Sequence, residues 1–274
     1  MKLKDIITVA YAKKYALGSF NVYNLETAKA VAKAVELTGK PAFMAVTEKA
    51  LDYAGYDELV GIMKELQAKA KNPFFIHLDH GSKIDVIKKC LKSGFDSVMF
   101  DGSSLPLDQN MQISKDLRVL AHRHGAVFEA EIGRVGGRED YKSAQEFKTN
   151  PSEALHFHSE VKPDMMAVAI GNIHGKLTAA ELLDFSLLAK INETVRAPLV
   201  LHGCSNRQDR EYKVAASEGI VKINIDTELR EVFANGLRLG LKRSSEPREV
   251  LTFASDAVTD RVKEKIEVFS KSEL

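Results

Sequence analysis

The chain has 274 residues, is 45% hydrophobic and carries a formal net charge of +1 at pH 7. This length suits one large domain or two small ones, and the balanced charge argues against nucleic acid or an acidic membrane as a partner. Two cysteines exclude a disulfide framework, and the absence of a run of about 18 apolar residues argues against a membrane-spanning helix. The first residues lack the apolar core of a signal peptide, so we expect a cytoplasmic protein.

Short apolar runs, typical of buried strands, alternate along the chain with amphipathic segments typical of helices. Asn24 and Gly39 flank the first amphipathic segment and are expected to cap a helix there. The predicted elements are, in order, strand 19–23, helix 25–38, strand 42–47, helix 56–70, strand 75–81, helix 84–92, strand 97–101, helix 109–124, strand 126–131, a polar segment 133–149, helix 152–160, strand 165–170, strand 198–201, strand 220–225 and a charged helical region at the C-terminus.

This alternation predicts a parallel sheet with helices packed against it. Eight strand–helix units in about 250 residues fit a (β/α)8 TIM barrel better than a doubly wound sheet. No GxGxxG motif follows the first strand, which argues against a dinucleotide-binding fold. No linker rich in Pro, Gly or Ser divides the chain. The expected class is therefore α/β, with residues 1–274 forming one TIM-barrel domain that ends in the charged helical region.

Polar residues follow the apolar runs at the carboxyl ends of the predicted strands, where TIM barrels place their active sites. Three apolar runs, one of them extending over 167–175, each end in a histidine followed by glycine. Three protein ligands and an open position are typical of a catalytic zinc site, whereas the alternative is that each histidine caps its own strand. The polar residues at these ends are Asn21, Thr47, Asp79, His80, Asp101, Glu131, His174, His202, Asn224, Asp226 and Thr227.

Several loops carry further candidates. Segments 203–205 and 224–227 follow the seventh and eighth strands, where TIM barrels often bind phosphate, although ordinary polar loops are the alternative. Segment 133–141 is punctuated by glycines and can act as a lid that carries an acid or a base; its Glu139 and Asp140 can equally be solvated surface carboxylates. Asp79 is a candidate acid or base, or it orients a histidine.

Six collinear segments resemble the class II ketose-bisphosphate aldolases, a family that includes fructose-1,6-bisphosphate and tagatose-1,6-bisphosphate aldolases. The resemblance covers roughly residues 1–240. Its segments are SFNV at 19–22, HLDHG at 77–81, EAEIG at 129–133 with GGRED at 136–140, AIGNIHG at 169–175, LHGCS at 201–205 and KINIDTE at 222–228.

The resemblance implies a zinc-dependent, reversible aldol cleavage of a ketose 1,6-bisphosphate to dihydroxyacetone phosphate and glyceraldehyde 3-phosphate, in a homodimer or homotetramer. Asp79 matches the acid that protonates the aldehyde oxygen during condensation, and Glu139 the base that removes a proton from C3 of dihydroxyacetone phosphate. The zinc ligands match His80, His174 and His202, and Glu131 matches a carboxylate that also reaches the metal. The substrate positions match Asn21, Thr47, Gly175, Gly203, Ser205, Asn224, Asp226 and Thr227.

Gly175 and Gly203 also match a site for a monovalent cation, Na⁺ or K⁺. Cys204 replaces a smaller residue of the family, and the C-terminal segment lacks the family's small-residue motif near the second phosphate. Asp226 favours fructose over tagatose bisphosphate. Lys222 is expected to have a structural or electrostatic role. Two other functions stay open: another metal-dependent barrel enzyme such as a hydrolase, and a non-catalytic sugar-phosphate-binding relative, which would not need Asp79 or Glu139.

Overall fold

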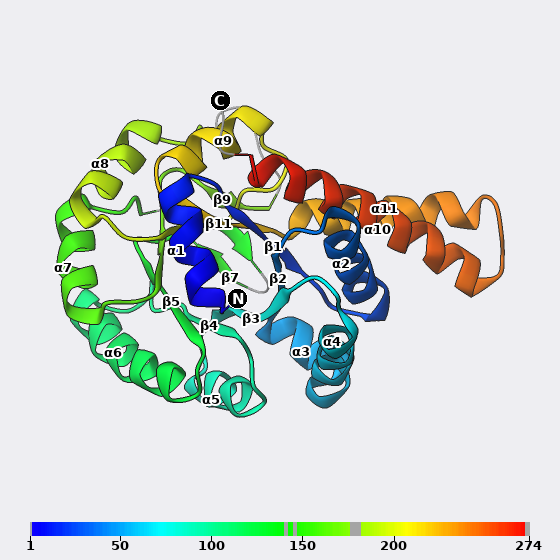
Figure 1. Cartoon of the computed structure of the whole chain (residues 1–274), viewed down its shortest axis with the longest axis horizontal. Coiled ribbons are helices and arrows are strands. Elements are labelled where there is room, and N and C mark those ends of the chain that lie inside the picture. Colours follow the sequence, from blue (N-terminus) through cyan, green and yellow to red (C-terminus); the bar gives the residue numbers. More distant parts are fainter. Residues whose placement is uncertain (1, 140–141, 145–146, 176–181, 272–274) are drawn as a thin grey trace.

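The computed structural model describes residues 2–139, 142–144, 147–175 and 182–271, with the backbone alone at 138–139 and 142–144. Within these residues, eight parallel strands close into a barrel that helices surround (Figure 1). Around the barrel the strands follow the order β1, β11, β10, β8, β5, β4, β3, β2, which confirms the predicted (β/α)8 TIM barrel. The strands are β1 (Leu17–Asn21), β2 (Ala42–Thr47), β3 (Phe74–Gly81), β4 (Ser97–Phe100), β5 (Val127–Ile132), β8 (Met165–Val168), β10 (Leu199–Leu201) and β11 (Ile220–Ile225).

Amphipathic helices form the outer layer. Helix α2 begins after Asn24, whose side chain accepts a hydrogen bond from the Thr27 N–H (2.9 Å), and ends at Gly39, whose φ is 66°. Both predicted caps are therefore confirmed, whereas α3 was absent from the predicted elements. The helices of this layer are α2 (Leu25–Thr38), α3 (Glu48–Ala54), α4 (Tyr56–Lys69), α5 (Ile84–Lys92), α6 (Leu107–Arg123), α7 (Pro151–Val161), α8 (Phe185–Val195), α9 (Asp209–Ser217), α10 (Thr227–Leu241) and α11 (Pro247–Phe269).

Helix α1 (Leu3–Lys13), also absent from the predicted elements, lies across the amino-terminal end of the barrel (Figure 1). Its Leu3, Ile6, Ile7 and Ala10 recur at helical spacing and are at most 7% exposed. These side chains join residues of the strands in one apolar cluster, which forms the floor of the barrel. Its strand members are Leu17, Phe43, Phe75, Met99, Val127, Met165, Ala167, Val200 and Val221.

A second, smaller sheet lies outside the barrel and comprises β6 (Gly136–Glu139), β7 (Lys142–Ala144) and β9 (Ile173–His174) within the described residues. Strand β9 pairs with β6 and carries His174, so the prediction of one continuous apolar strand ending in His174 is wrong. The barrel strand β8 ends at Val168. Gly171, with a φ of 100°, then turns the chain, and the Asn172 side chain accepts a hydrogen bond from the Ile170 N–H (2.7 Å).

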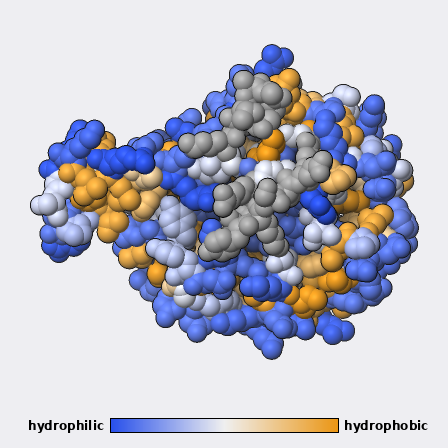
Figure 2. Space-filling model, turned by 180° about the vertical axis from the view of Figure 1, so that it is seen from behind, coloured by the Kyte–Doolittle hydropathy of each residue, from blue (hydrophilic) through white to orange (hydrophobic). Residues whose placement is uncertain are grey.

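Helices α10 and α11 pack along each other and project beyond the body of the barrel (Figure 1). Seen from the opposite side, the projecting part carries apolar residues among charged ones (Figure 2). Leu239 and Leu241 in this hairpin are 46% and 68% exposed. Among the helices that the structure describes, none combines the length and the apolar character needed to cross a bilayer.

We expect Ile7→Ala to lower the free energy of unfolding by about 2–5 kcal/mol, because it removes a 2% exposed side chain from the barrel floor. Val9→Ala is the matched control, since Val9 lies on the same helix but is 37% exposed; its effect should stay within about 0.5 kcal/mol. Urea unfolding followed by circular dichroism measures both. Equal losses would contradict the role of α1 as a packed floor.

Candidate active site

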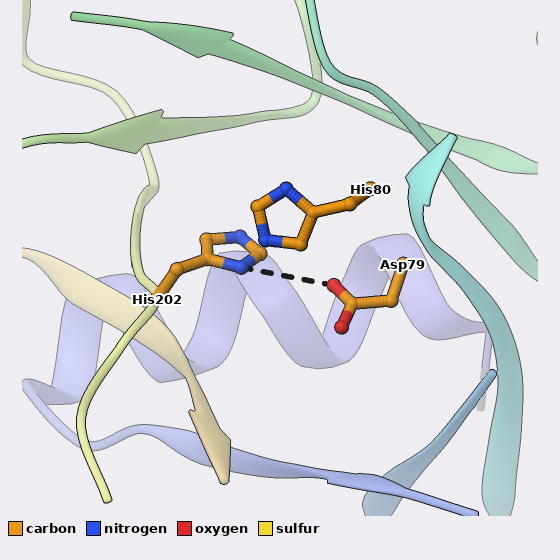
Figure 3. A group of neighbouring side chains, drawn as sticks. All are labelled: Asp79, His80 and His202. Atoms are coloured by element: carbon orange, nitrogen blue, oxygen red, sulfur yellow. Dashed lines mark ion pairs between the residues drawn. The ribbon is translucent and has the colours of Figure 1, made fainter. Parts of the chain in front are cut away.

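The carboxyl end of β3 departs from regular strand geometry. Adjacent residues of a strand ordinarily point to opposite faces, yet the side chains of Asp79 and His80 both point towards His202 (Figure 3). His80 has a φ of 47°, in the left-handed region that residues other than glycine rarely adopt. At the same place, the register of β3 with β4 shifts between Leu78 and Gly81. This irregular backbone brings two consecutive polar side chains into one site.

Asp79 is held by amides from two other strands. Its Oδ2 accepts a hydrogen bond from Asn21 Nδ2 and its Oδ1 accepts one from Asn224 Nδ2, each of 2.8 Å. Burial alone would raise the pKa of Asp79, but His80, His202, Lys222 and the hydrogen bond from Asn21 together lower the pKa to about 2. Asp79 is therefore a fixed and ionised carboxylate at neutral pH.

The three predicted zinc ligands come together. The ring centroid of His80 lies 4.4 Å from that of His202 and 5.0 Å from that of His174, and the other two rings are 6.3 Å apart. A Zn–N bond of about 2.1 Å places a ring centroid about 3.2 Å from the ion, so two ligand rings of a tetrahedral ion lie about 5.2 Å apart. The two distances from His80 are close to this value, whereas the distance between His174 and His202 exceeds it. Burial lowers the pKa of His174 to about 3 and that of His202 well below its ordinary value, which favours the neutral, metal-binding form.

His202 shows which of its nitrogens faces this site. Its Nε2 lies 2.8 Å from Glu129 Oε1, whereas its buried Nδ1 makes no hydrogen bond with any residue that the structure describes. Nδ1 instead lies 3.7 Å from Asp79 Oδ1 (Figure 3). The potential ligand atoms of Asp79, His80 and His202 are all within 4.8 Å of one another. A buried nitrogen without a partner is costly, so these residues fit a metal ion.

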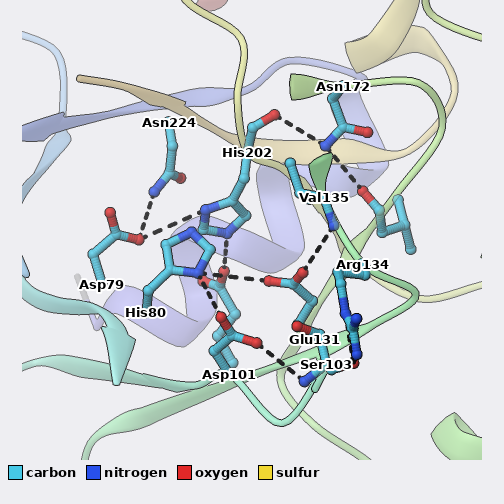
Figure 4. A network of polar contacts seen from close by, with 12 residues as sticks. Asp79, His80, Asp101, Ser103, Glu131, Arg134, Val135, Asn172, His202 and Asn224 are labelled. Carbon is cyan, nitrogen blue, oxygen red and sulfur yellow. Dashed lines mark hydrogen bonds and ion pairs between the residues drawn. The ribbon is translucent and has the colours of Figure 1, made fainter. Parts of the chain in front are cut away.

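Two carboxylates lie on the other side of the His80 ring (Figure 4). His80 Nδ1 is 3.1 Å from Asp101 Oδ2 and 3.7 Å from Glu131 Oε2. Burial raises the pKa of Glu131 to about 8, and the nearby Asp101 adds to the rise. These three residues form a second group whose potential ligand atoms lie within 4.8 Å of one another. Glu131 is thus placed to reach a cation beside His80.

A cavity lies beside Asp79 and His174 and collects the predicted substrate positions, with the exception of Thr47. Thr47 pairs in register with Asp79, but it is 6% exposed and its Oγ1 accepts a hydrogen bond from the Ala50 N–H as the N-cap of α3. The cavity is lined by Asn21, Asp79, Ile173, His174, Gly175, Gly203, Cys204, Ser205, Asn224, Asp226, Thr227 and Arg230.

The segments that carry His174 and His202 touch at Gly203. Its φ is 57°, and a Cβ there would lie 2.6 Å from the Ile173 carbonyl carbon. Asn172 adds a second link, because its Nδ2 donates to the His202 carbonyl oxygen (3.0 Å; Figure 4). The buried Cys204 thiol donates to the same oxygen (3.2 Å), and burial raises its pKa to about 12, so it stays protonated.

The predicted lid residues are only partly described. Glu139 is the last residue of β6 and pairs with Lys142, but its side chain lies outside the described part of the structure, as does the whole of Asp140. The position of β6 beside β9 nevertheless brings the backbone of this segment next to His174.

The sequence predictions assigned no role to Arg230 or Glu129, although both lie at the site. Arg230 follows Asp226 by one helical turn, and its Nη2 lies 2.9 Å from Asp226 Oδ2. Glu129 precedes Glu131 by two residues, the spacing that puts two strand side chains on the same face. That period-two signal could have identified Glu129 as a group facing the barrel interior.

We expect Gly203→Ala to destabilise the protein by about 1–3 kcal/mol, because alanine would combine a left-handed backbone with a clash against the Ile173 main chain. Gly61→Ala, the matched control, is in an exposed part of α4 with nothing within 4 Å of a new Cβ, and should stabilise by about 0.5–1 kcal/mol. Urea unfolding of both variants is the measurement. If the two changes shifted the midpoint equally, the close contact at Gly203 would be refuted.

Comparison with known proteins agrees with this geometry. The sequence model of the family described as fructose-bisphosphate aldolase class-II matches residues 1–273. The YdjI aldolase of Escherichia coli K12 is 29% identical, with a TM-score of 0.88 over 99% of this chain and 97% of that chain. A proposed fructose-1,6-bisphosphate aldolase from Coccidioides immitis is 26% identical, with a TM-score of 0.90 over 98% and 96%. The fructose-bisphosphate aldolase of Campylobacter jejuni, 20% identical, shares the fold with a TM-score of 0.83 over 97% and 93%. The predicted resemblance is thereby confirmed, and the chain belongs to the class-II fructose-bisphosphate aldolase family.

Proposed function

We propose that this aldolase depends on zinc and reversibly cleaves a ketose 1,6-bisphosphate, with fructose-1,6-bisphosphate as the first candidate, to dihydroxyacetone phosphate and glyceraldehyde 3-phosphate. One observation carries the proposal: the imidazoles of His80 and His202 lie close enough to share an ion, with His174 next to His80, beside the ionised carboxylate of Asp79. Metal-assisted aldol cleavage uses a metal site and a proton acceptor together, because the carbonyl must be polarised while a hydroxyl loses its proton.

In this proposal His80, His174 and His202 hold the zinc, and Glu131 reaches it from the side of Asp101. When bound, zinc supplies a Lewis acid that polarises the C2 carbonyl of the ketose. A lysine Schiff base is the alternative way to activate this carbonyl. Lys222, the lysine within β11, is unsuited to that role because it is fully buried and ion-paired with Glu129 rather than part of the cavity lining.

Asp79 acts on the proton of the C4 hydroxyl. In cleavage its carboxylate takes this proton as the C4 oxygen becomes the aldehyde oxygen, and the C3–C4 bond breaks with its electron pair left on C3. Glu139 then supplies a proton to C3, and in condensation it removes that proton again. The hydrogen bonds from Asn21 and Asn224 support this assignment, because they aim both Asp79 oxygens from fixed positions.

The dihydroxyacetone-phosphate end of the substrate is assigned to the loops after β9, β10 and β11. Gly175, Gly203 and Ser205 line the cavity, and Thr227 is the first residue of α10, whose amino-terminal amides attract anions. The main chain at the two glycines is also our proposed position for a monovalent cation. Asn224 then lies between this end and the reacting carbons.

The identity of the sugar is assigned to Asp226 and Arg230, which lie beside Thr227 at the start of α10. They form an ion pair of 2.9 Å at the cavity wall and offer an anion and a cation to a hydroxyl and a phosphate of the substrate. On this basis we favour fructose-1,6-bisphosphate, with tagatose-1,6-bisphosphate as the alternative. Thr47, which caps α3, would support Asp79 through its strand rather than touch the sugar.

We expect the purified protein to release dihydroxyacetone phosphate from fructose-1,6-bisphosphate faster than from tagatose-1,6-bisphosphate, because Asp226 is present. A chelator should abolish both activities and added Zn²⁺ should restore them, since carbonyl activation then depends on the ion. A coupled assay with each substrate, with and without chelator, measures this. Activity that resists the chelator and is trapped by borohydride would overturn the metal-dependent mechanism.

Two substitutions should separate metal binding from proton transfer. Glu139→Ala should reduce kcat by about 10²–10⁴-fold, the usual effect of losing a general base, while zinc content stays near that of the wild type. His174→Ala should instead lower zinc content, because it removes one of the proposed ligands. Metal analysis of dialysed protein together with kcat distinguishes the two. Full zinc occupancy in His174→Ala would remove His174 from the ligand set.

A further inference from the structure

Polar side chains occupy the barrel interior beneath the three imidazoles. His77 of β3, Ser97 of β4, Glu129 of β5 and Lys222 of β11 are all 0% exposed. Lys222 Nζ lies 2.9 Å from Glu129 Oε2, and His77 Nδ1 lies 3.0 Å from Ser97 Oγ. These groups lie deeper than the cavity, whose lining includes none of them. They cannot touch a substrate there, so any functional role must act through a neighbour.

Glu129 is the member that connects this layer to the site above. Its Oε1 lies 2.8 Å from His202 Nε2, while its Oε2 receives the ammonium group of Lys222. A histidine that binds a metal does so as the neutral imidazole, which has one N–H and one nitrogen lone pair. A carboxylate at hydrogen-bond distance accepts that N–H, which places the proton on Nε2 and leaves the lone pair on Nδ1.

Lys222 supplies the positive charge that balances the Glu129 carboxylate. The other basic group near Oε2, His77 Nε2, is farther away at 3.8 Å, so the Lys222 ammonium at 2.9 Å is the nearer counter-charge. A buried carboxylate without a counter-charge would be strongly disfavoured. Buried ion pairs add little net stability compared with apolar residues of similar size, so stability alone does not explain this pair.

We propose that Glu129 and Lys222 are positioning residues for the metal site: Lys222 pairs with the Glu129 carboxylate and holds it in place, and Glu129 holds His202 in the Nε2–H tautomer with Nδ1 facing the ion. This inference rests on the proposed zinc site and extends it by one layer into the barrel. The orphaned Nδ1, 3.7 Å from Asp79 Oδ1, is the atom whose direction the pair sets.

The first test uses the unmodified protein without metal. Nitrogen-15 NMR of the histidine side chains should show His202 with its proton on Nε2 and a pyridine-type Nδ1. A proton on Nδ1 would overturn the inference. Since this readout needs neither zinc nor substrate, it is independent of whether the chain proves to be a zinc-dependent aldolase.

The second test is a double-mutant cycle on zinc affinity, measured by competition with a chromophoric chelator. Glu129→Gln with Lys222→Met, which replaces the ion pair by groups of similar size, should weaken zinc binding by about 10–100-fold. Lys222→Met alone should weaken zinc binding at least about tenfold. Added to Glu129→Gln, the same change should weaken zinc binding by less than about a further threefold, because Lys222 acts through Glu129. Wild-type zinc affinity in the double variant would refute the role of the pair. Fully additive effects of the two substitutions would refute the inference that Lys222 acts through Glu129.

Phe43→Leu is the matched control for packing. The Phe43 ring is fully buried, and its centroid lies 5.8 Å from Lys222 Nζ and 5.7 Å from the ring centroid of His77. It is therefore a neighbour of the Glu129–Lys222 ion pair without being part of it. Zinc affinity should stay within about twofold of the wild type although the protein loses stability. A loss of zinc affinity equal to that of the double variant would show that general loosening, rather than the Glu129–Lys222 pair, governs the site.

The proposed function and this inference can fail separately. If zinc affinity follows these expectations but the protein has no cleavage activity, the proposed function is refuted and this inference stands.

Discussion

The left-handed backbone at His80 is the constraint on which the site depends. In a regular strand the side chains of Asp79 and His80 would point to opposite faces, so one of the two would point towards the helix layer and away from the site. With a φ of 47° at His80 and a register shift against β4, both face the barrel axis. Such a conformation costs about 1–2 kcal/mol for a residue with a Cβ, and the buried hydrogen bonds of Asp79 to Asn21 and Asn224 help to offset it.

The interior of the barrel changes character along its axis. On β3 the inward positions are Phe75, then His77, then Asp79, and on β5 they begin with Val127 and continue with Glu129. The floor is therefore apolar and supplies packing energy, the middle layer is polar but sealed, and the carboxyl ends are polar and reach the cavity. Each strand thus contributes to stability at one end and to chemistry at the other, as is usual in this fold.

Much of this arrangement could be read from the sequence, because short apolar runs and their polar ends are local signals. The barrel and the gathering of polar residues at the carboxyl ends of its strands follow from that pattern, whereas the irregular backbone that turns both Asp79 and His80 inward does not. The place of His174 does not, since Gly171 and Asn172 turn the chain out of the barrel and into a second sheet, and no periodicity encodes that partner. Nor does the pattern show that the Thr47 hydroxyl caps a helix, because this depends on where the chain turns after β2.

Helix α1 gives the barrel a closed base. With Leu3, Ile6 and Ile7 packed against the strand starts, apolar side chains fill the amino-terminal end of the barrel. A molecule bound at the carboxyl ends must then come and go by one and the same entrance. If cleavage yields two fragments, they share that exit, and the fragment lying deeper cannot depart until the outer one has cleared the way. The order of product release is in this sense set by the filled barrel interior, whose far end is the floor formed with α1, some distance from any reacting atom.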